Sequence, residues 1–548
     1  MSWFSPSLQS KILRHCVWWV VMAYALFYAL SFLFSWKVLH YFMAENLQVD
    51  LFLWALFLSL VGIYDVVQTR HSLLRNYPVI GHFRYLFEMV RPEIRQYLLE
   101  SDEESVPFSR AQRSLVYQRA KNLGADRPFG SILDVYATGY EFISHSLTPV
   151  AKSSPESFRI TIGNEQCAQP YSASIFNISA MSFGSLSPNA IRALNAGARR
   201  GGVYHDTGEG SISPYHLENG GDLVWELGSG YYGCRDEEGH FDPDRFAEKA
   251  ALPVVKMIEI KMNQGAKPGH GGILPKEKIT PLIAEVRGVS MGKDCVSPSA
   301  HSAFHTPLEL MEFIRRLREL SKGKPVGFKL CIGRPAEFMA IVKAMRQTGI
   351  APDFIVVDGA EGGTGAAPVE FSDHLGMPLR EGLLLVHNTL VGAGVREHVR
   401  IGAAGKIISA FDIARTLALG ADWVNSARGF MFALGCIQSQ ACHTNLCPTG
   451  VATQDETRQK ALIVGDKTER VFHFHHNTLT SLAEMLAAAG LKHPADVRPE
   501  HLVVRVSDLE VQTYKERYEF LEEGALLNGA AAHPFYREMW DRARAEVF

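Results

Sequence analysis

Short apolar segments alternate with helical patterns over most of the chain from about residue 170 onward. The apolar segments are rich in β-branched residues, which are typical of buried strands. We therefore predict strands at 175–181, 254–262, 326–332, 354–357 and 423–426, and helices at 307–320 and 335–348, which both open with a proline. Strand, loop and helix repeated over about 300 residues predict a parallel α/β fold, and this length fits a (β/α)8 TIM barrel.

The first 70 residues have a different pattern. Residues 16–36 form a run of 21 residues without Asp, Glu, Lys or Arg, and a helix needs about 20 such residues to cross a bilayer. A second apolar run, 51–64, lies between Asp50 and Asp65 and becomes long enough to span when extended to Val67. The pattern predicts an N-terminal transmembrane helical hairpin. The alternative is one span followed by an interfacial helix.

The basic residues predict the orientation of this hairpin. They flank the two apolar runs on the outside, whereas the connecting segment holds Lys37 against Glu45 and Asp50. The flanking residues are Lys11, Arg14, Arg70, Arg75 and Arg84. The positive-inside rule then predicts an inner (cytoplasmic) membrane protein whose catalytic domain faces the cytoplasm.

Four regions follow from these patterns: the hairpin at 1–70, a helical adaptor at 71–150, the barrel at 151–470 and a helical extension at 471–548. In the adaptor, Arg91-Pro92-Glu93 is expected to open a helix that ends at the acidic run 100–104. The formal net charge of −3 gives no support for nucleic-acid binding. Five of the eight cysteines are scattered singly, which is typical of a reducing compartment.

The other three cysteines share one short segment. Cys436, Cys442 and Cys447 are separated by five and then four residues, and Pro448 follows the last. A short irregular loop lets three thiolates converge on an iron–sulfur cluster, and three ligands suit three irons better than four. Two alternatives remain open from spacing alone: three reduced structural cysteines, or a Cys3His zinc site that uses His443.

Several glycine-rich blocks accompany this loop in a fixed order. They are 179–184 (SAMSFG), 207–210 (TGEG), 264–269 (QGAKPG), 362–366 (GGTGA) and 448–454 (PTGVATQ). Together they closely resemble the FMN-binding synthase domain of the glutamate synthase large subunit, of the ferredoxin or NADPH type, over roughly residues 150 to 470. This resemblance implies FMN and a 3Fe-4S cluster held by the three cysteines.

Two further loops are candidates for the flavin phosphate. In TIM barrels the last two loops commonly hold a phosphate group. Here those loops contain 402–406 (GAAGK) and 427–429 (ARG), so Gly405, Lys406, Ala427, Arg428 and Gly429 are candidate ligands. Glycines let backbone N–H groups approach a phosphate, and an arginine adds a bidentate partner.

The resemblance also implies the flavin ring site. It places Ser179, Ala180, Met181 and Ser182 along the isoalloxazine ring, together with Gly363, Thr364 and Gly365. It places Lys329 near the N1/O2 edge of the ring and the bound oxo acid, where a cation stabilises a reduced flavin. The alternative for Lys329 is a structural lysine paired with a carboxylate.

Glu209, Gln264 and Lys267 resemble the residues that surround the 2-oxo acid. Lys267 and Gln264 offer the cationic and amide donors that a dicarboxylate needs. Glu209 is the candidate for proton transfer, although it would serve equally as a structural partner of Lys267 or Lys329. Two positions depart from the family pattern: His270 replaces an acid, and Glu361 replaces a shorter aspartate.

Other expected features of such synthases are missing. The chain begins Met1-Ser2-Trp3, so no N-terminal nucleophilic cysteine of an amidotransferase domain is expected, and no Gly-x-Gly-x-x-Gly fingerprint follows a strand. Electrons are therefore expected from a ferredoxin-like protein, a separate reductase or quinone.

The leading hypothesis is reductive amination of 2-oxoglutarate, through 2-iminoglutarate, with ammonia or an amine as nitrogen donor. A second is a membrane-anchored FMN/Fe-S dehydrogenase of an amino acid or related substrate that passes electrons to quinone. A third is a non-catalytic membrane scaffold.

Overall fold

The computed structural model describes residues 53–68, 72–99, 101, 107–124, 126, 128–528 and 533–548. The chain divides into two compact units, Met1–Ser101 and Asp102–Phe548, and each is described by itself. The first predicted membrane run, 16–36, lies outside the described residues.

The described part of the first unit is helical. Residues 53–67 form one helix, followed by α2 (Ser72–Asn76), α3 (Gly81–Ile94) and a π-helical turn η1 (Arg95–Leu99). The predicted helix start at Arg91-Pro92-Glu93 is wrong, because α3 begins at Gly81 and already contains these residues. The helix geometry changes only after them, in the π turn η1. None of the helices among the described residues combines the length and the hydropathy of a membrane span.

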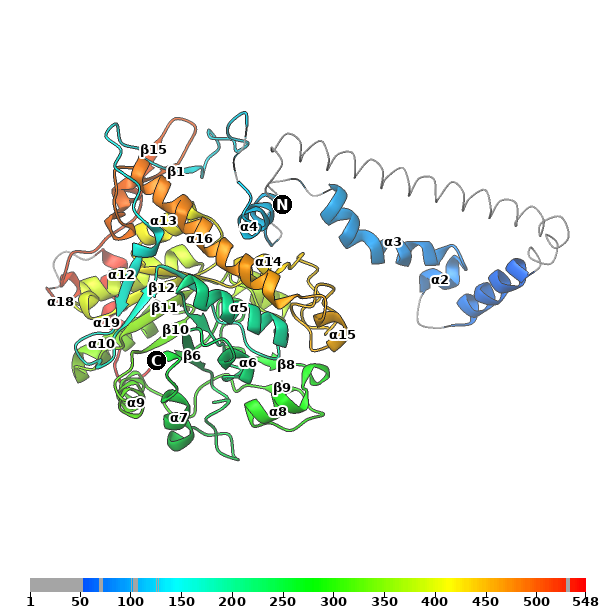
Figure 1. Ribbon diagram of the computed structural model, residues 1–548, viewed down its shortest axis with the longest axis horizontal. Coiled ribbons are helices and arrows are strands. Elements are labelled where there is room, and N and C mark those ends of the chain that lie inside the picture. The colour runs from blue at the N-terminus through cyan, green and yellow to red at the C-terminus, as the bar shows by residue number, and fades with distance from the viewer. Residues whose placement is uncertain are drawn as a thin grey trace, which may run out of the picture. The chain divides into compact units, whose positions relative to one another are not determined.

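The second unit contains a closed barrel of eight parallel strands (Figure 1). In chain order they are β4 (Phe176–Ile178), β5 (His205–Asp206), β6 (Leu223–Leu227), β7 (Val255–Lys261), β10 (Val326–Leu330), β11 (Phe354–Asp358), β12 (Arg400–Ala404) and β13 (Trp423–Ser426). The last strand pairs with the first, Val424 with Phe176, which closes the barrel. The predicted TIM-barrel class and the five predicted strands are confirmed.

A helix follows each barrel strand. These helices are α5 (Pro188–Gly201), α6 (Pro214–Leu217), α7 (Pro243–Ala250), α9 (Pro307–Leu320), α10 (Pro335–Thr348), α12 (Leu379–Gly392), α13 (Ala410–Ala418) and α14 (Arg428–Leu434). Local sequence explains their starts: Ser187 and Thr306 accept backbone N–H groups of α5 and α9, and a proline takes the next position. The predicted bounds of α9 and α10 agree with the structure.

Further elements surround the barrel. The strands β1 (Glu141–Ile143), β14 (Leu502–Arg505) and β15 (Val511–Thr513) form a small sheet, and β2 (Arg159–Ile162) pairs with β3 (Tyr171–Ser174). After β7 come the pair β8 (Ile273–Leu274) and β9 (Cys295–Val296) and helix α8 (Pro281–Arg287). Shorter elements are α11 (Val369–His374), α15 (Glu456–Gln459), α17 (Tyr514–Arg517), α18 (Ala525–Asn528) and α19 (Pro534–Arg542).

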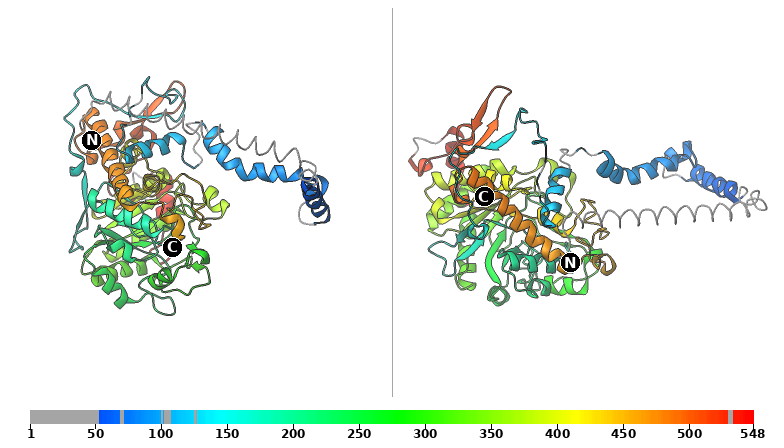
Figure 2. Two further views of the ribbon diagram at one scale, coloured as in Figure 1. Left: turned by 45° about the vertical axis from the view of Figure 1, so that its right-hand side comes forward. Right: turned by 45° about the horizontal axis from the view of Figure 1, so that its top comes forward.

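Two helices outside the barrel repeat matter for the site. The long helix α16 (Val464–Ala488) contacts both α5 and α4 (Arg110–Ala120), as the views in Figure 2 also show. The C-terminal extension predicted as helical therefore begins within α16 and also contains the strands β14 and β15.

Candidate functional site

One cavity of ≈ 180 Å³ opens at the carboxyl ends of the barrel strands. This is the face on which TIM-barrel active sites lie. The cavity is lined by every residue predicted for catalysis or cofactor binding. These are Ser179, Ala180, Met181, Ser182, Glu209, Gln264, Lys267, Lys329, Gly363, Thr364, Gly365, Gly405, Lys406, Ala427, Arg428 and Gly429. The structure thus brings together blocks that lie 250 residues apart in sequence.

The segment 179–182 continues directly from β4 into the cavity wall. Ser179 donates its backbone N–H to the carbonyl of Ser426 at 3.1 Å, which joins it to the end of β13. Gly208 lies against the same segment, because a Cβ at this position would come within 2.6 Å of the Ser182 nitrogen. Backbone therefore forms this wall, and a planar ligand can approach it closely.

The two predicted phosphate loops follow β12 and β13. Lys406 adopts a left-handed conformation, φ 49°, in the turn after β12, and α14 begins at Arg428 directly after β13. Arg428 donates from Nη2 to the carbonyl of Thr364 at 2.6 Å and so links its loop to the glycine loop after β11. A Cβ at Gly365 would meet no atom within 4 Å, so this loop borders open space.

Lys329 is buried on β10 and still lines the cavity. Its Nζ donates to Glu226 of β6 and lies 3.5 Å from Oε1 of Glu259 on β7. Burial lowers the pKa of Lys329, but Glu226, Glu259 and other carboxyl groups outweigh this and raise it well above its usual value. Lys329 therefore has the carboxylate partners of a structural lysine, and it also faces the cavity.

Glu209 is paired with Lys261, which the sequence analysis did not single out. Glu209 Oε1 accepts a hydrogen bond from Lys261 Nζ at 2.8 Å, and Oε2 accepts one from Ser297 at 3.2 Å. Burial raises the pKa of Glu209, but the charge and hydrogen bond of Lys261 lower it to about 2. The alternative of a structural lysine partner for Glu209 is thus met by Lys261 of β7, and not by Lys267 or Lys329.

Lys267 and Gln264 lie on the loop after β7. Gln264 donates to the Thr364 hydroxyl at 3.3 Å, while burial, followed by the neighbouring Lys261, lowers the pKa of Lys267. A buried ammonium in this position favours an anionic ligand. The two donors predicted for a dicarboxylate thus share one wall of the cavity.

The two departures from the family pattern have different surroundings. His270 lines a smaller cavity beside Glu209 and Lys261, and its Nδ1 lies 2.9 Å from the Gly271 carbonyl. Glu361 accepts the backbone N–H of Leu379 at 3.0 Å, at the start of α12. Glu361 therefore stabilises the start of α12.

The cysteine loop borders the same cavity. Cys442 and His443 line it, and buried Lys278 donates to the carbonyls of Ser185, Cys442 and Ala452 at 2.9 to 3.1 Å. This ammonium holds the loop against the segment that follows β4. The cavity wall and the cysteine loop are therefore one connected structure.

The sulfur of Cys447 is surrounded by donors. Burial raises its pKa, but backbone N–H groups of Ala452, Thr449 and Val451 and the Thr449 hydroxyl hold the pKa of Cys447 below its usual value. N–H groups directed at sulfur favour a thiolate, as at iron–sulfur sites. Among the described residues, the three cysteines and His443 do not bring their ligand atoms within 4.8 Å of one another.

The sequence analysis missed several charged residues of the site. They lie inside barrel strands or at their ends: Asp206, Glu226, Glu259, Lys261 and Asp358. Their sequence positions could have indicated them, because a charged residue on a buried strand needs a partner. The same reasoning had identified Lys329.

The comparisons with known proteins agree with this architecture. The family described as the conserved region in glutamate synthase matches residues 144–492. The glutamate synthase large subunit-like protein YerD of Bacillus subtilis is 37% identical over 503 residues, which covers 84% of this chain and 94% of YerD.

Archaeal and archaeal-type relatives match about three fifths of this chain. The archaeal-type glutamate synthase [NADPH] of Thermotoga neapolitana is 33% identical, covering 60% of this chain and 61% of the relative. The archaeal glutamate synthase [NADPH] of Methanocaldococcus jannaschii is 33% identical, covering 59% and 60%. The chain thus spans about three fifths of these two relatives. With most of its length matched by the family, the chain belongs to the glutamate synthases, a family of oxidoreductases that act on CH–NH2 donors.

Proposed function

We propose that this protein uses FMN and a 3Fe-4S cluster to aminate 2-oxoglutarate reductively, yielding glutamate. The observation that carries the proposal is the single cavity lined by candidate flavin residues, candidate oxo-acid residues and Cys442. If the flavin, oxo-acid and cysteine residues lay in separate cavities, they could not form one reaction centre.

The cavity residues fit FMN. Backbone of 179–182 offers a flat wall, Gly365 leaves open space, and Lys406 and Arg428 bring two cations to the loops that follow β12 and β13. These are the chemical features that a ring and a phosphate need. When bound, FMN supplies hydride transfer to the substrate.

The cysteine loop fits an iron–sulfur cluster. Its three sulfurs are free of disulfides, and the sulfur of Cys447 accepts backbone hydrogen bonds. Because the ligands of a multi-iron cluster bind different irons, their sulfurs need not lie as close together as the ligands of one ion. Cys442 borders the cavity, so a cluster held there would lie beside the flavin site.

The substrate role rests on charge. Condensation of ammonia with 2-oxoglutarate releases water and gives 2-iminoglutarate, and two electrons and two protons then give glutamate. Lys267 and Gln264 supply donors for the dicarboxylate, and Lys329 supplies a further cation at the cavity wall. Glu209, ionised beside Lys261, is suited to accept a hydrogen bond from the nitrogen donor.

We also propose that the N-terminal region binds the inner membrane, with the barrel on the cytoplasmic side. The uncharged run 16–36 supports this, as do the exposed apolar side chains Trp54, Phe57, Leu60 and Ile63 of the helix at 53–67. Electrons would then come from a ferredoxin-like protein, a separate reductase or quinone. Retention of the intact protein in washed membranes, and its release on removal of the first 70 residues, would support the anchor; recovery of the intact protein without detergent would contradict it.

The catalytic proposal is tested under anaerobic conditions with chemically reduced protein. Flavin reoxidation is recorded with 2-oxoglutarate and ammonium, with each alone, and with other 2-oxo acids. We expect fast reoxidation only with both substrates, and glutamate in the product. Lys267→Met should lose this response, whereas Lys276→Met, at an exposed lysine nearby, should keep it. Reoxidation by quinone, together with flavin reduction by an amino acid, would instead support the dehydrogenase hypothesis.

A further inference from the structure

Beneath the cavity, a single ammonium faces several carboxyl groups. Lys329 donates to Glu226 and lies 3.5 Å from Glu259, and Asp206 and Asp358 also act on its charge. These five side chains come from neighbouring barrel strands, β5, β6, β7, β10 and β11. Lys329 and Glu226 also line the cavity, so the group is in contact with the site where ligands bind.

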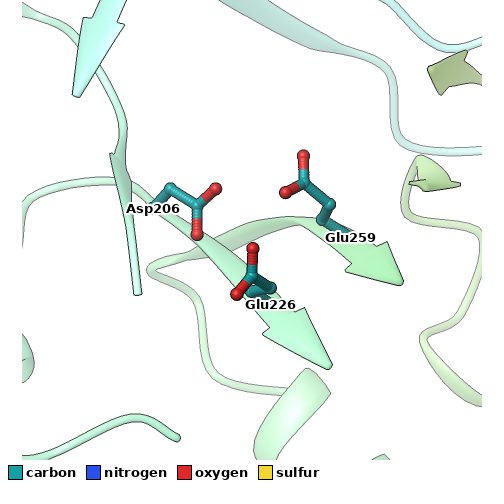
Figure 3. A group of neighbouring side chains, drawn as sticks. All are labelled: Asp206, Glu226 and Glu259. Carbon is teal, nitrogen blue, oxygen red and sulfur yellow. The ribbon is translucent and has the colours of Figure 1, made fainter. Parts of the chain in front are cut away.

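Three of the carboxyl groups are mutually close. Oxygens of Asp206, Glu226 and Glu259 all lie within 4.8 Å of one another, and all three side chains are buried (Figure 3). Barrel register explains this, because Glu226 and Glu259 are direct partners across β6 and β7. Three buried carboxylates at this spacing would repel one another strongly, and one ammonium cannot offset them.

Protons are the simplest means of balancing this charge. Oε1 of Glu259 has no hydrogen-bond partner among the described residues, although the side chain is only 2% exposed. A protonated Glu259 becomes a donor to its carboxylate neighbours. In agreement, burial and then Asp206 raise the pKa of Glu259 well above its usual value.

Among the three carboxyl groups, Asp206 is the one whose pKa is raised toward neutrality. Burial, and then Glu226, raise the pKa of Asp206 to about 7, although Lys329 and the Gly208 N–H lower it. Three further groups near these carboxyls have partners of their own. Lys261 is paired with Glu209, Asp358 accepts the Gly265 N–H at 2.8 Å, and the Tyr204 hydroxyl is bonded to Asn425.

We propose that Asp206, Glu226 and Glu259 form a proton-sharing cluster that keeps Lys329 charged and takes up a proton when negative charge enters the cavity. The proton comes from solvent and converts one carboxylate to a carboxylic acid, so no electrons are exchanged at the cluster. The coupling of this cluster to oxo-acid binding rests on the proposed function. The sharing of protons within the cluster does not depend on that function, and it is tested without substrate.

The first experiment measures protonated carboxyl groups by infrared spectroscopy at pH 7, with carboxyl-labelled glutamate and aspartate to assign the bands. The unmodified protein should show a carboxylic acid C=O band that Glu259→Gln removes. Glu361→Gln is the control, because Glu361 is bound to backbone at the start of α12 and should leave the band unchanged. Absence of the band, or a stoichiometric divalent cation that Glu259→Gln abolishes, would overturn the proposal.

A stability comparison covers variants that fold poorly. Glutamine can replace a protonated glutamate as a donor, so Glu259→Gln should keep the melting temperature of the unmodified protein. Glu226→Gln removes the hydrogen-bonded counterion of Lys329 and should lower it strongly, and adding Lys329→Met should restore it. If Glu226→Gln and Glu259→Gln changed the melting temperature equally, this would contradict the assignment of the proton to Glu259 and of the negative charge to Glu226.

The second experiment measures proton uptake when 2-oxoglutarate binds, by calorimetry in buffers of different ionisation enthalpy. With a pKa near 7, Asp206 should take up about half a proton per ligand at pH 7 and almost none at pH 5, where it is already protonated. Asp206→Asn should abolish the uptake, and Glu361→Gln should not. Binding without proton uptake at pH 7 would overturn the coupling, whereas failure to bind 2-oxoglutarate with the infrared band intact would contradict the proposed substrate alone.

Discussion

Glu209 and Lys261 form an ion pair in the cavity wall, with Oε1 and Nζ 2.8 Å apart and both side chains largely buried. Lys261 also carries the carbonyl that lies 2.9 Å from Nε2 of His301, so its strand end is fixed from two sides. The pair lowers the pKa of Glu209 to about 2, so Glu209 is a carboxylate at neutral pH.

Replacing Lys261 by Met should raise the pKa of Glu209, because burial would then act without a cation to oppose it. If turnover needs the Glu209 carboxylate, the acid limb of kcat/KM should move upward by about two pH units or more. Lys261→Arg should keep most of the original profile. A profile that does not change in Lys261→Met would show that Glu209 ionisation is irrelevant to turnover.

Gly365→Ala should weaken FMN binding without weakening the fold. A methyl group at Gly365 meets no atom within 4 Å, so the flavin-free protein has room for it, but it projects from a loop that borders the cavity. We expect the Kd for FMN to rise about tenfold or more, which corresponds to about 1.4 kcal/mol. Gly333→Ala is the matched control, because Gly333 also has open space and lies outside the residues lining the cavity. Equal FMN affinity in both variants would remove this loop from the cofactor site.

Cys442→Ser should abolish the iron–sulfur signal in electron paramagnetic resonance and lower the iron content from about three atoms per chain. Cys167→Ser is the control, since Cys167 is half-buried elsewhere and donates to the Gly323 carbonyl at 3.3 Å. Iron content that is unchanged in Cys442→Ser, or zinc in place of iron in the unmodified protein, would refute the cluster.

Glu141→Gln should destabilise the second unit by about 2–4 kcal/mol. Glu141 accepts from Arg380, Arg415 and the Tyr514 hydroxyl. The variant leaves the Arg380 guanidinium without its counterion and leaves Arg415 paired with Asp412 alone. Glu484→Gln, in an exposed pair with Lys152, should cost about 0–1 kcal/mol in the same denaturation experiment.

The same variant predicts a pH dependence. Burial raises the pKa of Glu141, but Tyr514, Arg380 and Arg415 lower it below its usual value. A carboxyl group with a lowered folded-state pKa adds stability above its unfolded pKa and loses it as the pH falls through the folded value. The unmodified protein should therefore lose stability in acid more steeply than Glu141→Gln. Parallel curves would contradict this assignment.

The sequence predicted the barrel because its strands and helices are local patterns. Helices α9 and α10 have the predicted bounds since a proline and an apolar face define each one within a few turns. Most of the cavity residues were predicted because the glycine-rich blocks resemble those of glutamate synthases. Where one proline was the only signal, at residue 92, the prediction of a helix start was wrong.

The ion pairs of the site could not be predicted in the same way. Lys329 meets Glu226, and Glu209 meets Lys261, because β5, β6, β7 and β10 lie side by side in the barrel and their ends meet. Which charged residues pair depends on strand register, and register across a parallel sheet is not visible in the spacing of one sequence. A more limited prediction was possible, since Glu259 and Lys261 are two residues apart on β7 and must share a face.

Helix α4 and the residue Phe108 before it also hold the cysteine loop. The side-chain amide of Gln438 accepts a hydrogen bond from the Phe108 N–H and donates one to the Phe108 carbonyl, at 3.2 Å each. The Tyr117 hydroxyl donates to the Cys436 carbonyl at 2.6 Å. Any shortened version of the protein prepared for spectroscopy or crystallisation should therefore begin before Phe108. A chain trimmed past Tyr117 would keep all eight barrel strands and the three cysteines of the loop, yet it would lose the contacts that fix one end of the cysteine loop.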